Sequence, residues 1–249
     1  MRSDTHIPST PSSRPSRDFR NPSASPLQET RRSTSISGSK CGTPFPDEKV
    51  GFSFGVEDPI TTAWELQGQG FLTDLFDEPE RVKQFLQLTS ASIVDVFRFR
   101  AELDGIQFPD PSATGMVDDI NSFVPAHIFA EFVLPYWEQY HAGITTGIRR
   151  AHVEDLRREQ LRFLQDVGLS YFDPPISHKL DPPMLRDEMQ EPFGWRLGNC
   201  HYRDMDEELV RDFLFQAAAD GTATTQPSFC PVGETAPTQV WSGMTVCCG

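Results

Sequence analysis

Apolar residues along the middle of the chain follow two spacings, one typical of strands and one typical of helices. Short apolar runs predict six strands, and apolar residues recurring every three or four positions predict the helices between them. The predicted strands span 50–56, 105–108, 148–153, 169–172, 193–197 and 222–229. The predicted helices span about 61–76, 77–103, 125–140, 156–167, 183–189 and 206–219.

Local signals support several of the predicted helix ends. Pro79 and the acidic residues around it are typical of a helix start, because proline fits the first turn and acids favour the positive end of the helix dipole. Gly143, Gly168 and Gly221 follow predicted helices, where glycine is a common terminator. Repeated strand and helix alternation predicts an α/β protein with a parallel sheet, either open or closed into a barrel.

The number of predicted units limits the architecture. A complete TIM (β/α) barrel has about eight strand and helix units in roughly 250 residues. Six strands within about 200 residues fall short of this by roughly two units, so a TIM (β/α) barrel here would be incomplete. Three explanations remain open for the shortfall: the chain is a fragment, its sheet is open, or a partner completes it.

Composition divides the chain into three parts. Residues 1–40 contain 11 Ser, 5 Pro, 4 Thr and 6 Arg with few large apolar side chains, so they bury too little surface to offset the entropy of ordering. We therefore expect a disordered leader over 1–49, with an organellar targeting segment as the alternative. Residues 50–233 form the predicted barrel portion, and 234–249, with Cys247 and Cys248, form an irregular tail.

Charge and cysteine content restrict the partners and the compartment. Residues 1–50 carry a net charge of +3 and the remainder −17, so the folded part should repel nucleic acid. No apolar run is long enough to span a bilayer, which predicts a protein with no membrane partner. Five cysteines without a CxxC pair or a secretory signal fit a reducing compartment, and the cytoplasm is the expected location.

Five short segments carry a more specific pattern, in order along the chain. They are Asp58-Pro-Ile-Thr-Thr62, Ala101-Glu-Leu-Asp-Gly-Ile-Gln-Phe108, Asp110 with Ser112, Glu131-Phe-Val-Leu-Pro-Tyr136, and Gly198-Asn199. These segments resemble motifs of the uroporphyrinogen decarboxylase superfamily, which includes decarboxylases of porphyrin biosynthesis and zinc-dependent methyltransferases that act with corrinoid proteins. The resemblance covers roughly Val50 to Cys230 and implies a TIM barrel.

The resemblance also implies a zinc site. The methyltransferase branch has an H-x-C motif at one strand end and a further cysteine at the last strand end, and similar positions here hold His152, Glu154 and Cys230. Residues two apart on a strand share a face, and imidazole, carboxylate and thiolate are all zinc ligands. Glu154 replaces the family's cysteine, which makes the site harder, and Asp155 is expected to support His152. The alternative is a hydrogen-bonded strand-end histidine followed by the acidic start of a helix.

Other polar residues are expected near the same mouth of the barrel. Asp110 and Ser112 follow a predicted strand and are the candidate catalytic residues, although Pro109-Asp-Pro-Ser112 is also a strong turn sequence. Candidate substrate contacts are Glu65, Arg150, Arg196, Asn199 and His201. Each of these is also compatible with an ordinary surface, capping or packing role.

Three functions follow as hypotheses. The first is zinc-assisted methyl or related group transfer involving a small thiol or carboxylate substrate, with a corrinoid protein as partner by family analogy. The second is a metal-free decarboxylase, a lyase acting on a tetrapyrrole of the uroporphyrinogen type. The third is a truncated, inactive barrel that acts as an interaction module. A homodimer is left open in each case.

Overall fold

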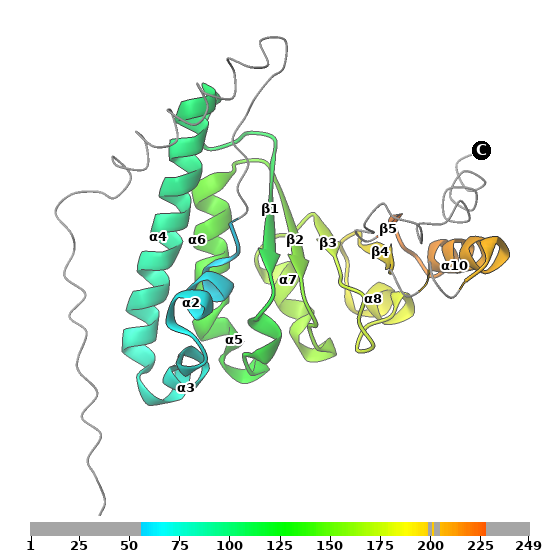
Figure 1. The fold of residues 1–249 in the computed structure, drawn as a ribbon, viewed down its shortest axis with the longest axis horizontal. Helices are drawn as coiled ribbons and strands as arrows, with labels where there is room; N and C mark the ends of the chain where they lie inside the picture. Colours follow the sequence, from blue (N-terminus) through cyan, green and yellow to red (C-terminus); the bar gives the residue numbers. More distant parts are fainter. Residues whose placement is uncertain (1–55, 199–200, 202–204, 228–249) are drawn as a thin grey trace, which may run out of the picture. The chain divides into compact units, whose positions relative to one another are not determined.

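The computed structural model describes residues 56–198, 201 and 205–227 as an alternation of helices and parallel strands (Figure 1). The strands are β1 (Ala113–Asp118), β2 (Ile148–Val153), β3 (Tyr171–Asp173), β4 (Gly194–Leu197) and β5 (Thr224–Pro227). The α-helices are α2 (Pro59–Gln67), α3 (Gly70–Asp77), α4 (Pro79–Asp104), α5 (Ala126–Phe132), α6 (Leu134–Ile144), α7 (Arg162–Asp166), α8 (Pro182–Glu188) and α10 (Glu207–Ala219). Two short 3-10 turns lie at Asn121–Phe123 and Arg158–Gln160.

The strands form two parallel sheets in sequence order. β1, β2 and β3 pair side by side, and β4 pairs with β5. A single bridge between Phe172 and Phe193 links β3 to the start of β4. The predicted α/β class and parallel pairing are therefore confirmed, whereas the predicted incomplete TIM barrel is not, because the described strands form two separate sheets. Most of the strand predicted at 50–56 lies outside the described residues.

The long helix α4 matches its prediction closely, and two shorter predicted helices are divided. α4 begins at Pro79 and ends where Gly105 adopts a left-handed conformation with φ of 65°. The helix predicted over 61–76 is interrupted at Gly68, whose φ of 79° is strained for other residues, so α2 and α3 are separate. The helix predicted over 125–140 is likewise divided into α5 and α6, with Pro135 in the first turn of α6.

The strand predicted over 105–108 is wrong. Gly105 caps α4, and Ile106 is 59% exposed, so the apolar pattern there does not mark a buried strand. The chain then contains Pro109 and Pro111, which have no N–H to give to a sheet. Pairing begins with an isolated bridge between Asp110 and Thr145, and the strand itself starts at Ala113.

One face of the sheet is packed against helices and the other is more open. Met116, Ala151, Val153 and Phe172 are buried in the same core as the aromatic residues of α5 and α6. Those aromatic residues are Phe129, Phe132, Tyr136, Trp137 and Tyr140. Because neighbouring strand residues alternate between faces, Ile148, Arg150 and His152 share the opposite face, on which Ile148 and Arg150 are exposed.

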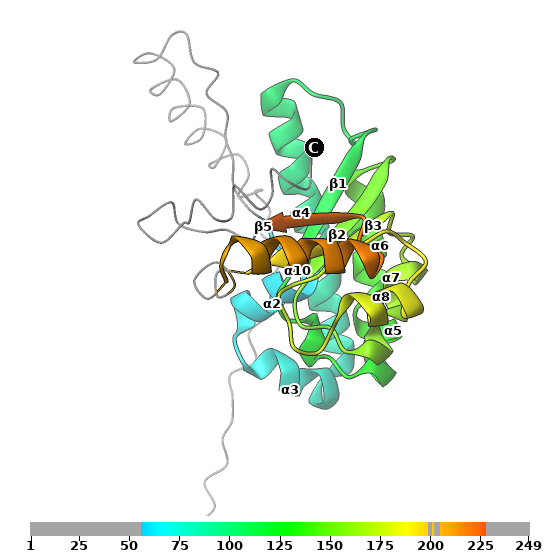
Figure 2. The same ribbon diagram turned by 90° about the vertical axis from the view of Figure 1, so that its right-hand side faces the viewer.

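A smaller core holds the last helix in place. Asp206 caps the start of α10 by accepting a hydrogen bond from the N–H of Leu209 at 2.9 Å. Val210 and Leu214 of α10 pack with Leu197 of β4, and the helix lies beside β5 (Figure 2). Within the described residues, no helix is both long and apolar enough to cross a membrane.

Candidate functional site at the carboxyl ends of the strands

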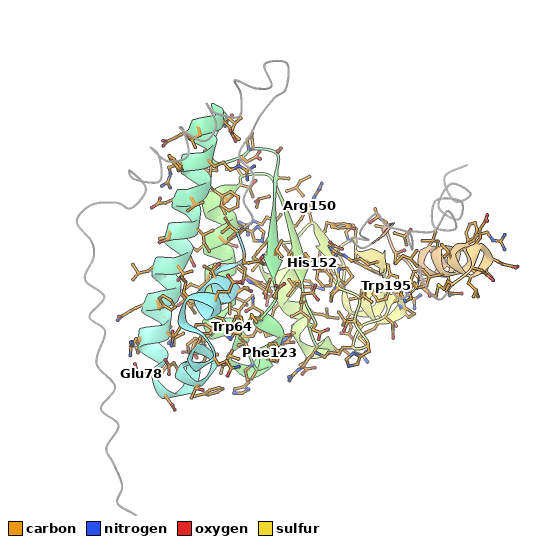
Figure 3. All side chains as sticks on the ribbon, in the orientation of Figure 1. Trp64, Glu78, Phe123, Arg150, His152 and Trp195 are labelled. Atoms are coloured by element: carbon orange, nitrogen blue, oxygen red, sulfur yellow. The ribbon has the colours of Figure 1, made fainter. Side chains whose placement is uncertain are left out.

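The carboxyl end of β2 carries a histidine and a glutamate in direct contact. Nε2 of His152 lies 2.8 Å from Oε1 of Glu154. Nδ1 of His152 lies 2.7 Å from the carbonyl oxygen of Asp173, its paired residue on β3. The imidazole is therefore fixed at both nitrogens, at the position shown for His152 in Figure 3.

An arginine from β4 completes this cluster. Nε of Arg196 donates to Oδ1 of Asp173 at 3.0 Å, and Nη2 of Arg196 donates to Oδ2. Such a two-point contact between guanidinium and carboxylate fixes both side chains. Asp173 therefore joins β2, through its carbonyl, to β4, through its carboxylate. We call His152, Glu154, Asp173 and Arg196 the charged cluster.

The proton distribution follows from these contacts. Nε2 of His152 faces a carboxylate oxygen, whereas Nδ1 faces both the Asp173 carbonyl and, at 3.2 Å, Nη2 of Arg196. Burial and the charge of Arg196 lower the pKa of His152, but the hydrogen bond to Glu154 and the contacts with Asp173 outweigh them and raise that pKa above its ordinary value.

Two buried carboxyl groups lie near the end of β1, and the sequence analysis missed both. Asp58 caps α2 by accepting from the N–H of Thr61 at 2.6 Å. Its second oxygen accepts from Nδ2 of Asn121 at 2.8 Å and Nε1 of Trp137 at 2.9 Å. Asp118 is also fully buried, and its Oδ1 accepts from the N–H of Asn121 at 2.8 Å. We call Asp58 and Asp118 the buried acid pair.

The two acids do not have equivalent surroundings. Burial and the charge of Asp58 raise the pKa of Asp118 well above its ordinary value. Burial also raises the pKa of Asp58, although hydrogen bonds from Thr61 and its other donors oppose that shift. Oδ2 of Asp118 has no hydrogen-bond partner within the described part of the chain. Of the two acids, Asp118 therefore has the greater tendency to remain protonated.

Asp118 ends a strand that the sequence marks only weakly. Thr114, Met116 and Asp118 are buried and alternate with the exposed Gly115 and Val117, but polar and apolar residues occur on both faces, so the sequence does not show this alternation. The strand was predicted instead at the more apolar segment 105–108, before Pro109 and Pro111. The acidic residues at the end of β1 are therefore Asp118, its last residue, and Asp119, which follows it.

The structure places Asp110 and Ser112 at the opposite end of the sheet. They precede β1, so the expectation that they follow a strand, which was the basis of their proposed catalytic role, is wrong. Oδ1 of Asp110 accepts from the N–H of Ser112 at 2.8 Å and from its hydroxyl at 2.7 Å. This is the turn geometry that the sequence allowed as the alternative.

The remaining predicted contacts are dispersed. Glu65 is exposed on α2, and Arg150 is exposed on β2. His201 accepts at Nδ1 from the N–H of Gly198 at 2.9 Å and lies against Phe213, and partial burial lowers its pKa. Asn199 and Cys230 lie outside the described residues.

The charged cluster supplies part of the predicted metal site. Of the three predicted ligands, His152 and Glu154 are in contact and Cys230 is not described. Across residues 56–198, 201 and 205–227, no group of three His, Cys, Asp or Glu side chains is arranged to hold a metal. Asp155, expected to support His152, instead pairs with Nζ of Lys179 at 2.9 Å.

Parallel strands joined by helices define an α/β protein, and charged side chains lie at the carboxyl ends of its strands. The fold is similar to that of a methyltransferase from Methanosarcina mazei, with a TM-score of 0.61 and 12% sequence identity. The similarity covers 76% of this chain and 56% of that one, so the chain spans little more than half of the neighbour's length. No family model matches the sequence, and no curated protein matches it.

Proposed function

We propose that this protein is an enzyme that transfers a methyl or related group to or from a small thiol, using zinc bound by His152, Glu154 and Cys230. The observation that carries the proposal is the contact of His152 and Glu154 at the carboxyl end of a parallel strand. Catalytic residues of β/α proteins lie at this edge of the sheet. The methyltransferase fold similarity agrees with the proposal at the level of architecture.

The two described ligands fit a zinc ion chemically. Metal-binding histidines commonly donate their second N–H to a carbonyl or carboxylate, and Nδ1 of His152 has the carbonyl of Asp173 as its acceptor. That contact leaves Nε2 as the ligand atom, beside Oε1 of Glu154. Zinc in such a site supplies a Lewis acid that lowers the pKa of a bound thiol. A carboxylate ligand makes the site harder than one with two cysteines.

The protein's own groups orient the site. The Asp173 carbonyl fixes the tautomer of His152, and Arg196 holds Asp173 through its carboxylate. Arg196 is therefore a positioning residue in this proposal and not a substrate contact. His152 would hold the metal through Nε2 of its neutral imidazole, so metal binding would replace the present contact of Nε2 with Glu154. A corrinoid protein as methyl donor or acceptor is part of the proposal by family analogy only.

The decarboxylase alternative receives less support from the described contacts. A tetrapyrrole with several carboxylates needs several free cations, and the arginines on β2 and β4 that could supply them are Arg149, Arg150 and Arg196. Arg149 pairs with Glu138 at 2.5 Å, and Arg196 pairs with Asp173, so only Arg150 is left without a described partner.

Zinc content of the purified protein tests the proposal. We expect about one zinc per chain, with loss of at least tenfold in affinity on His152→Ala, Glu154→Ala or Cys230→Ala. His178→Ala and Cys41→Ala serve as controls, because neither residue belongs to the proposed site. No zinc above background in the parent protein, or zinc unchanged in Cys230→Ala, contradicts the proposal.

A further inference from the structure

The open face of the sheet presents its side chains in two rows across the strands. The strand register sets Gly115, Arg150 and Tyr171 opposite one another. Two residues further along each strand, it sets Val117, His152 and Asp173 opposite one another. Arg150 lies on the same face as His152 because the two residues are two positions apart on β2. It is nearer the start of β2 (Figure 3).

Of the three arginines on β2 and β4, Arg150 is the one without a partner among the described residues. Arg149, its neighbour on the opposite face, donates to Oε1 and Oε2 of Glu138 and to the carbonyl of Val167. Arg196 is held by Asp173. Arg150 is exposed, and within the described residues it has no hydrogen bond or ion pair. An unpaired guanidinium beside a reactive centre is suited to recognition of an oxyanion.

The residues beside Arg150 on the two neighbouring strands differ in size. Gly115 on β1 leaves space next to Arg150, whereas Tyr171 on β3 fills the space on the other side. A Cβ added to Gly115, directly across from Arg150 on β1, meets no atom within 4 Å. On the other side, the hydroxyl of Tyr171 lies 2.5 Å from the hydroxyl of Thr224. A Cβ at Gly194 would collide with that Tyr171 hydroxyl, so the absence of a side chain at Gly194 allows the two hydroxyls to meet.

We propose that Arg150 forms an anion subsite that binds the carboxylate of a short substrate whose reacting group lies at His152 and Glu154. This inference rests on the proposed function for the position of the reacting group. Cα atoms two residues apart on a strand are about 7 Å apart, so a ligand that reaches both positions is short. The favoured substrate class is thus a small thiol with a carboxylate on a chain of a few carbon atoms.

Binding of propionate, measured by saturation-transfer NMR titration, tests the subsite without a thiol. We expect millimolar binding of propionate, and none of 1-propanol, because the neutral alcohol has no charge for Arg150. Arg150→Gln should weaken propionate binding about tenfold or more, and Arg150→Lys should retain part of it. Arg149→Gln is the matched control, since it removes the same charge from the opposite face.

The outcomes separate this inference from the metal proposal. Absent propionate binding by the parent protein, or equal weakening by Arg149→Gln and Arg150→Gln, would overturn the subsite, provided that thermal melts show both variants folded. Propionate binding that survives His152→Ala, in a protein that binds no zinc, would retain the subsite and remove the metal. A second titration with 3-mercaptopropionate should show tighter binding than propionate only if His152 and Glu154 hold the metal.

Discussion

At the scale of single residues, the contacts of the two carboxyl groups in the buried acid pair assign them different roles. Asp58 accepts from three N–H donors of Thr61, Asn121 and Trp137 and behaves as a carboxylate. Oδ2 of Asp118 has no hydrogen-bond partner among the described residues, and Asp118 has a greater tendency than Asp58 to keep its proton. The hydrogen bonds of the pair therefore join α2, β1 and α6, and Asp118 is the acid that more readily keeps its proton.

This assignment predicts opposite results for two equivalent substitutions. Asp58→Asn should lower the free energy of unfolding by about 2–4 kcal/mol, because an amide cannot accept from all three donors and leaves one unpaired. Asp118→Asn should change it by less than about 1 kcal/mol, because an amide resembles the protonated acid. Urea unfolding at neutral pH measures both, and a greater loss in Asp118→Asn than in Asp58→Asn would refute the assignment.

The pH dependence of Asp118→Asn has a definite sign. A raised pKa means that the folded protein keeps a proton that the unfolded chain loses above its ordinary pKa, so this group's contribution to stability falls as pH rises through that window. The asparagine variant lacks this loss. Its stability relative to the parent should therefore increase as pH rises from the unfolded acid's pKa towards the raised one.

Residue-scale prediction succeeded where chemistry and spacing were combined. His152 and Glu154 were placed together because residues two apart on a strand share a face, and the structure brings them into contact. Asp58 was part of a recognised segment, but its role depends on Asn121 and Trp137, which lie far from it in sequence. No local pattern reports a hydrogen bond between residues so distant along the chain.

At the scale of elements, α4 and α6 approach each other closely at a glycine. A Cβ on Gly143 would lie 2.5 Å from Cγ2 of Val94, so the lack of a side chain permits the contact. The sequence analysis interpreted Gly143 as a helix terminator, whereas α6 continues to Ile144. The local sequence looks the same whether such a glycine ends a helix or lies at a close contact between helices. Only the packing in the structure distinguishes the two roles.

This contact predicts a coupled pair of substitutions. Gly143→Ala should reduce the free energy of unfolding by about 1–3 kcal/mol, since overpacking outweighs the better helix propensity of alanine. Val94→Ala in the same chain should relieve the overlap, so that the double variant loses less than the sum of the single ones. Gly70→Ala is the control, because a Cβ there meets nothing within 4 Å. Additive losses in the double variant would contradict the close contact.

Element boundaries were predictable where the pattern was regular. The strand predicted over 148–153 matches the bounds of β2. The strand predicted over 105–108 failed because Ile106 and Phe108 give an apolar run that belongs to a connection and not to the sheet. Helix divisions at Gly68 and before Pro135 depend on tertiary packing as well as on local propensity.

At the scale of the whole molecule, the fold brings the residues of the candidate site together. Sequential parallel strands bring His152, Asp173 and Arg196 from β2, β3 and β4 to one edge. The α/β class was predictable from alternating periodicities. Barrel closure was not, because closure depends on pairing between distant strands. The similarity to a methyltransferase supports the fold, and group transfer with zinc is our proposal for its use.

X-ray absorption at the zinc edge of the zinc-loaded protein tests the central claim most directly, because it reports the ligand atoms themselves. We predict one sulfur at about 2.3 Å together with nitrogen and oxygen ligands at about 2.0–2.2 Å, including one imidazole. His152→Ala should remove the imidazole signal, and Cys230→Ala should remove the sulfur. A shell made only of sulfur, or a spectrum unchanged by both substitutions, would contradict a zinc site at His152, Glu154 and Cys230.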